Sequence, residues 1–192
     1  MYDPIIRYIS KYIALSQEDI RLFTSVLRTR KIRKRQFLLQ EGDISKYEYF
    51  VVRGCLKAYF TDAEGKEHIL QFAVEDWWIN DLQSFTSGEP AKLNIEALEE
   101  TEVFQIEKEQ LEDLYIKIPL LNNLFRQLFQ SAFIALQSRV VDNLSKPAKE
   151  RYLSFISKYR NIEQRVPQHT IASYLGITPE FLSQIRKKIS QE

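Results

Sequence analysis

The polar residues near the C-terminal end of the chain have types and spacing that suit contact with the edges of DNA bases. In "TIASYLGITPEFLSQI" (residues 170–185), apolar residues recur at helical spacing on both sides of one glycine. Glu180, Ser183 and Gln184 fall on the side of the second helical pattern away from its apolar residues. Carboxylate, hydroxyl and amide groups of this kind read base edges in the major groove. The stretch therefore predicts a DNA-reading helix.

Two short helices joined by a tight turn are needed to hold those side chains outward. Gly176 can adopt the left-handed conformation that ends a first helix, and Thr178 can cap a second one with Pro179 in its first turn. The residues that would pack the two helices together are Ile171, Ala172, Leu175, Leu182 and Ile185. This is the pattern of a helix-turn-helix, whose second helix enters the major groove. The alternative is a helical hairpin with no nucleic-acid partner.

The predicted DNA-contacting set combines this face with the basic residues beside it. Residues 146–192 carry nine Lys or Arg against four Asp or Glu, a net charge of +5, whereas residues 1–145 have a net charge of −4. A basic end on an acidic body is typical of a nucleic-acid-binding appendage. The set is His169, Thr170, Thr178, Pro179, Glu180, Ser183, Gln184, Arg186, Lys187 and Lys188.

The rest of the chain must provide a body for this appendage. Residues 3–27 have helical periodicity, with Ser16 placed to cap a helix over residues 17–27. From Arg28 to about residue 107, runs of β-branched and aromatic residues are separated by turn-like "EGD", "RG" and "DAEGK", which predicts an antiparallel sandwich or barrel. "RTRKIRKR" (residues 28–35) is interpreted as a solvated edge, with a second nucleic-acid contact as the alternative.

A long helix is predicted from Leu120 to Leu144, after a helical segment at 108–116 and a break at Pro119. Two neighbouring apolar stripes run along it, so two surfaces must cover it. The first stripe has the spacing of a coiled-coil seam and predicts a homodimer, although a helix held between the chain's own domains is the alternative. The seam residues are Leu121, Phe125, Leu128, Ala132 and Ala135; the second stripe is Phe129, Phe133, Leu136, Val140 and Leu144. A further helix is expected from about Pro147.

The composition argues against several other kinds of protein. One cysteine and two histidines, without a glycine-rich phosphate loop, leave no catalytic group, so no enzyme is predicted. Cys55 cannot form an internal disulfide or supply the roughly four thiolates of an iron–sulfur cluster, and no metal or other cofactor is predicted. No apolar run approaches a membrane span of about 20 residues. We expect a cytoplasmic protein without a membrane partner.

The chain resembles the Crp/Fnr family of bacterial transcription regulators over nearly its whole length. The resemblance rests on "LLQEGDISKYEYFVVRGCLKAYFTDAEGKEHILQF" and on the closing helix-turn-helix. It implies an α+β fold: an N-terminal cyclic-nucleotide-binding-like β-roll or jelly-roll (residues 1–117), a long dimerisation helix (118–145) and a C-terminal winged helix-turn-helix (146–192). At the positions that match the family's base-contacting residues, this chain has Pro179, Glu180, Ser183 and Gln184, so the resemblance implies that these residues read bases. Many relatives have arginine, which suits guanine, where this chain has Gln184, which suits adenine.

The predicted effector pocket departs from the family pattern. Family members that bind cyclic nucleotides hold the ribose with a glutamate and the phosphate with an arginine. Here Asn80 and Asp81 stand at the Gly-Glu positions, Leu82 follows, and Ala91 and Lys92 replace the arginine pair. Ala91 cannot neutralise a buried phosphate, and Lys92 would face the other way on a strand. No tight binding of cyclic AMP is predicted; the alternative is a slipped alignment in which Lys92 replaces the arginine.

These observations predict a homodimeric, sequence-specific DNA-binding transcription regulator. Its expected partners are double-stranded DNA, a second copy of the chain, RNA polymerase and a small-molecule effector whose identity stays open. The alternative is a ligand-binding module whose C-terminal domain docks a protein.

Overall fold

Two short helices open the chain. The computed structural model describes residues 2–159 and 161–191. These helices are α1 (Asp3–Ile9) and α2 (Gln17–Ser25). Ser16 caps α2 as predicted: its Oγ accepts a hydrogen bond from the Asp19 N–H at 3.0 Å, and the Asp19 carboxylate accepts one from the Ser16 N–H at 3.0 Å. This capping box satisfies two backbone groups at the start of the helix.

In the described part of the chain, eight strands form two four-stranded antiparallel sheets, which confirms the antiparallel β architecture predicted from the turn spacing. The strand orders are β1-β8-β3-β6 and β2-β7-β4-β5. The strands are β1 (Arg28–Ile32), β2 (Phe37–Leu39), β3 (Tyr47–Arg53), β4 (Leu56–Thr61), β5 (Glu67–Ala73), β6 (Trp78–Ile79), β7 (Asn94–Ala97) and β8 (Thr101–Glu107). Between β6 and β7 the chain forms the short helix α3 (Leu82–Ser87).

Three apolar cores lie against the two sheets, one of them shared between the sheets. Val51, Leu56, Ile95 and Val103 are fully buried in a core formed by residues of both sheets. Beyond the first sheet, Phe50 and Phe104 pack in a second core with residues of α1, α2, α4 (Lys108–Lys117) and the start of α5 (Leu120–Ser145). The third core, described below, joins the second sheet to the C-terminal helices.

The long helix α5 confirms the predicted helix but corrects its predicted seam. Leu121 is fully buried and Phe125 is 4% exposed, because both pack within the chain's own second core. They therefore cannot form the contact between two copies. Of the other seam residues, Leu128 packs partly against that core, Ala135 is half-buried and Ala132 is exposed. Most of the large exposed apolar residues of α5 belong to the second stripe: Phe129, Phe133, Leu136, Val140 and Leu144; Leu120, Ile134 and Val141 are also exposed.

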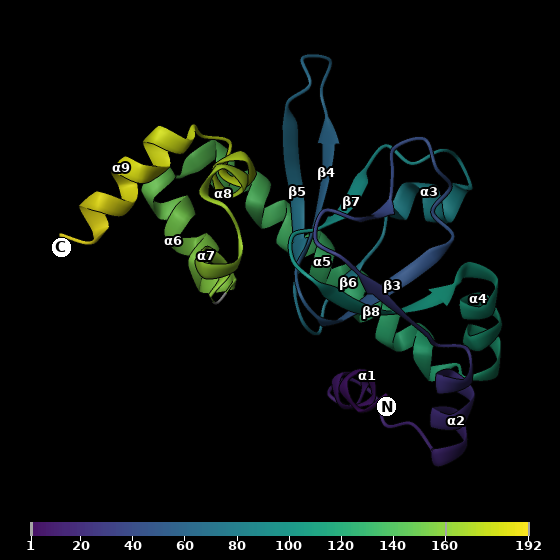
Figure 1. Ribbon diagram of the computed structural model, residues 1–192. Helices are drawn as coiled ribbons and strands as arrows, with labels where there is room; N and C mark the ends of the chain where they lie inside the picture. The colour runs from purple at the N-terminus through teal and green to yellow at the C-terminus, as the bar shows by residue number, and fades with distance from the viewer. Residues whose placement is uncertain (1, 160, 192) are drawn as a thin grey trace.

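Among the residues that the structure describes, four helices follow α5 and form a separate group beside the second sheet (Figure 1). They are α6 (Ala148–Lys158), α7 (Ile162–Arg165), α8 (Gln168–Leu175) and α9 (Pro179–Ile189). Pro147 stands at the N-cap of α6, one residue before the first turn. Among the described residues no strand follows β8, so the predicted wing stays a prediction. No helix in the described part of the chain has the length and apolar character needed to cross a membrane.

Candidate nucleic-acid interface

The turn between α8 and α9 forms as its sequence predicts. Gly176 ends α8 in the left-handed region, with φ of 67°. The Ile177 N–H donates to the Ala172 carbonyl at 3.0 Å, and the Thr178 Oγ accepts a hydrogen bond from the Phe181 N–H at 3.2 Å. Pro179 occupies the first turn of α9. Local backbone chemistry therefore fixes where the second helix begins.

Packing between α8 and α9 decides which side of α9 is exposed. Leu182 is fully buried and Ile185 is 6% exposed, in a core that they share with Ile171, Ala172 and Leu175. The opposite side of α9 carries polar and basic side chains: Glu180, Ser183, Gln184, Lys187 and Lys188 are all exposed. In Figure 1, α9 runs away from the strands, whereas α8 lies next to β5. The polar face of α9 is thus open to solvent.

Other members of the predicted set differ in their exposure. His169 is exposed, whereas Arg186 is half-buried, with its Nε 3.5 Å from a carboxylate oxygen of Glu163. Thr170 corrects the prediction, because only 4% of it is exposed. It lies at the start of α8, which packs against both β5 and α9, so its side chain is removed from the DNA-facing set.

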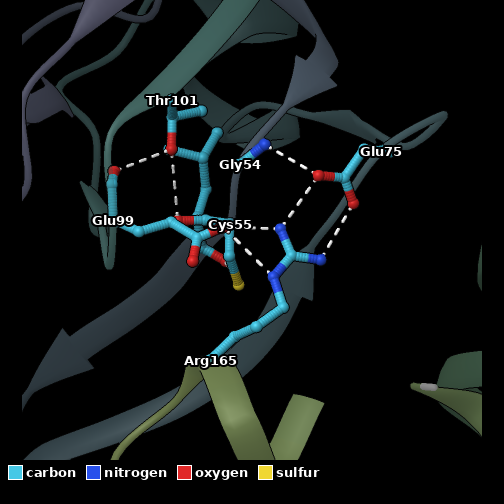
Figure 2. Close-up of polar contacts among 7 residues, drawn as sticks. Gly54, Cys55, Glu75, Glu99, Thr101 and Arg165 are labelled. Carbon is cyan, nitrogen blue, oxygen red and sulfur yellow. Dashed lines mark hydrogen bonds and ion pairs between the residues drawn. The ribbon is translucent and has the colours of Figure 1, made fainter. Parts of the chain in front are cut away.

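Ion pairs hold this helix group against the β-domain (Figure 2). The Arg165 guanidinium, at the end of α7, donates two hydrogen bonds to Glu75, each of 2.9 Å, and two to the Glu99 Oε1, at 2.6 and 3.1 Å. Burial opposes ionisation of Glu75, but hydrogen bonds from Arg165 and the Gly54 N–H outweigh it and lower the pKa of that carboxyl. Cys55 lies beside this cluster, and burial raises the pKa of its thiol to about 12. The thiol is therefore protonated at neutral pH.

A second arginine ties α5 to both neighbours. Arg139 donates to the carbonyls of Ile69 and Leu70 in β5 and to that of Tyr174 in α8, at 3.0, 2.5 and 2.8 Å. Its guanidinium also lies 3.9 Å from the centre of the Tyr174 ring. Neither arginine was singled out from the sequence, because their partners lie 35 to 90 residues away and leave no local pattern.

A cleft of about 620 Å³ separates the second sheet from the starts of α8 and α9. Lys34 and Arg35, from the predicted solvated edge, line it and are exposed. Lys57 also lines it but is buried, with its Nζ 2.5 Å from Glu67 and 3.1 Å from Glu96. Within residues 2–159 and 161–191, no group of His, Cys, Asp and Glu side chains could hold a metal ion.

In the predicted effector pocket, the Asp81 carboxylate accepts hydrogen bonds from the chain's own backbone. Asp81 is 3% exposed; one carboxylate oxygen accepts from the Ser84 N–H at 3.1 Å, and the other accepts from the N–H groups of Lys92 and Leu93 at 3.1 and 3.2 Å. Ala91 is buried and Lys92 is exposed, but both lie in the loop before β7 rather than in a strand, so strand alternation does not set their directions. Leu82 corrects the prediction, because it is 48% exposed and points out of the fold.

Sequence reasoning missed Glu48, the acidic partner of this region. Its side chain is buried on β3, and its Oε2 accepts a hydrogen bond from the Asn80 Nδ2 at 2.6 Å. Burial raises the pKa of Glu48 to about 8, and the hydrogen bond from Asn80 only partly opposes that rise. The available signal was a lone carboxylate in the otherwise aromatic and apolar run "YEYFVV".

Comparison with known proteins agrees with this arrangement. Residues 29–117 match the family model described as cyclic nucleotide-binding domain. The transcriptional activator protein Anr of Pseudomonas protegens is 24% identical over 191 residues, covering 93% of this chain and 78% of that protein. The fumarate and nitrate reduction regulatory protein of Escherichia coli is 28% identical over 186 residues, covering 89% and 72%. The structure of FixK2 from Bradyrhizobium japonicum has a TM-score of 0.77 at 20% identity, covering 86% of this chain and 85% of that one.

The class defined by these findings is a two-part protein in which a β-domain of the cyclic nucleotide-binding kind is followed by a long helix and a C-terminal helical group. Its homologues are regulators by name rather than enzymes. The chain is similar over most of its length to these two regulators. The structure of a putative transcriptional regulator of the Crp/Fnr family from Eubacterium rectale has the same fold, with a TM-score of 0.69 at 19% identity, covering 92% of this chain and 84% of that one. These similarities confirm the resemblance inferred from the sequence.

Glu48 gives a testable pH dependence. The folded chain keeps the Glu48 proton up to about pH 8, whereas the unfolded chain releases it near pH 4.5. The stability from the neutral group is therefore fully present below pH 4.5 and is lost as the pH rises to about 8. We expect Glu48→Gln to gain stability relative to the wild type across this window, by on the order of a few kcal/mol. Urea unfolding at several pH values measures the stability difference between the variant and the wild type. Glu109→Gln, which changes an exposed residue, is the control. A difference independent of pH would contradict the assignment.

Proposed function

We propose that this chain is a sequence-specific DNA-binding transcription regulator of the Crp/Fnr type. The observation that carries the proposal is the polar face of α9, where Glu180, Ser183 and Gln184 are exposed while Leu182 and Ile185 lie in the core. Arg186, Lys187 and Lys188 form the last turn of the same helix, where positive side chains can meet phosphates. The names of the relatives, a transcriptional activator and a regulatory protein, support it. RNA polymerase as a partner and a cytoplasmic location are part of the proposal.

The homodimer in this proposal uses the exposed stripe of α5. Phe133 is 66% exposed, Leu136 54% and Leu144 85%, so a helix about 26 residues long presents apolar side chains along its second half. Exposed apolar surface on this scale marks a protein contact. A second copy of the same stripe is self-complementary, as a two-fold dimer requires. Two copies would place two reading helices about 34 Å apart on one side of the DNA.

The sensor part of the proposal is a pocket that does not bind cyclic AMP. Ala91 brings no charge, and the exposed Lys92 side chain is not directed into the fold. The Asp81 carboxylate, at the position where relatives hold the ribose, already accepts three backbone hydrogen bonds. A cyclic nucleotide would therefore lack both a counter-ion for its phosphate and a free acceptor for its hydroxyl.

Selection of bound sites from random duplexes tests the function. We expect a near-palindrome whose half-site centres are about 10 base pairs apart, because the dimer axis sets the spacing. Binding should weaken steeply with salt, since phosphate contacts release counterions. Failure to enrich any duplex would reject the DNA-binding proposal and favour docking of a protein partner.

Two variants of α9 separate base reading from phosphate binding. Gln184→Ala should lose about 1–3 kcal/mol of discrimination at one base pair in each half-site and tolerate other bases there. Lys187→Ala should weaken binding to all duplexes alike and reduce the salt dependence. Fluorescence anisotropy with a set of singly substituted sites measures both. If both variants lower general affinity only, Gln184 does not read a base.

The exposed stripe of α5 gives a test of the dimer. Phe133→Asp places a charge at the proposed contact, so we expect monomers and a large loss of affinity for the full palindrome. Because Phe133 is 66% exposed in the single chain, the fold should survive. Ser131→Asp, on the opposite side of α5, is the matched control and should stay dimeric. Sedimentation velocity measures the outcome; a dimeric Phe133→Asp variant would contradict this contact.

A further inference from the structure

Phe181 is an apolar side chain on the reading helix that the packing of the fold does not use. It lies in the first turn of α9 and is 47% exposed, whereas its neighbour Leu182 is fully buried. Helical spacing places Phe181 in one row with Gln184 and Lys188, three and seven residues further on, and both of these are exposed. The row therefore presents an aromatic ring, an amide and a cation in that order from the start of the helix.

The ring limits which chemical group it can meet in the major groove. A phenylalanine has no hydrogen-bonding group, so placing it against a polar base edge would leave that edge unpaired at a cost. The C5-methyl group of thymine is the apolar feature that base pairs present in this groove, and phenylalanine is one of the side chains that contact it. Since the first residues of a recognition helix lie closest to the bases, Phe181 is positioned for such a contact.

We propose that Phe181 recognises the C5-methyl group of a thymine within two base pairs of the base bound by Gln184. This inference rests on the proposed DNA-binding function and deepens it. Side chains three residues apart on a helix have Cβ atoms about 5–6 Å apart, and successive base pairs are separated by about 3.4 Å. The two side chains therefore address the same or nearby base pairs, and the half-site contains an A·T pair at this position.

Replacement of single thymines by deoxyuridine tests the proposal, because it removes the methyl group and keeps every hydrogen-bonding group. With the full chain and a selected duplex, we expect one thymine in each half-site whose replacement raises Kd about fourfold, the value of burying one methyl-sized group. Phe181→Ala should bind the thymine duplex more weakly and lose this sensitivity. Phe181→Leu should keep part of it, since the apolar contact is retained.

Two controls separate this effect from general damage. Gln184→Ala should keep the penalty for deoxyuridine, because its amide does not contact the methyl group. Thermal unfolding should show the Phe181 variants folded, as expected for a side chain that is 47% exposed.

The outcomes are distinct. If the wild type binds a selected duplex but no deoxyuridine raises Kd, or if Phe181→Ala keeps the penalty, the Phe181 assignment is overturned and DNA binding stands. If the wild type binds no duplex, both the proposed function and this inference are overturned.

Discussion

Part of the outer face of the β2-β7-β4-β5 sheet, around Tyr59, Ile69 and Phe72, is apolar, and the C-terminal helices cover it. Phe72, on β5, lies with its ring centre 5.4 to 5.9 Å from the rings of Phe155, Tyr159 and Tyr174. This aromatic cluster makes one core of the sheet, α6 and α8. Because α8 then has β5 on one side and α9 on another, the polar side of α9 can only face solvent. The position of the proposed reading face therefore follows from burial of the sheet.

Charged groups specify how these parts fit together. Between the helices and the β-domain, Arg165 meets Glu75 and Glu99. Within the β-domain, Lys57 lies between Glu67 and Glu96, and Asp81 accepts backbone hydrogen bonds. A buried or half-buried charge without such partners would cost several kcal/mol, so a shifted docking of the helices would be strongly disfavoured. Apolar contacts favour association of the C-terminal helices with the β-domain, and the paired charges favour one relative arrangement of the two. Glu48 avoids the cost of a buried charge in another way, because burial raises its pKa and keeps the side chain neutral near pH 7.

Local features of the fold could be predicted from the sequence, whereas long-range ones could not. Gly176 and Thr178 were recognised because their roles depend on residues within four positions. Thr170 was not, because it is buried through the contact between α8 and β5, about 100 residues earlier in the chain; the Ser173 hydroxyl donates to the Glu67 carbonyl there. In α5 both apolar stripes were recognised, but which one faces outward depends on how Leu121 and Phe125 pack against α4 and the first sheet.

Arg139 has a consequence for the thermodynamics of the proposed DNA recognition. Its guanidinium joins β5, α5 and α8 through three carbonyls, and any displacement of one segment leaves at least one of these groups unpaired. The helices α8 and α9, which pack on each other, therefore lose their orientational freedom when the chain folds. Binding through α9 therefore does not incur the entropy cost of ordering these helices a second time. A larger share of the interaction energy then appears as binding affinity.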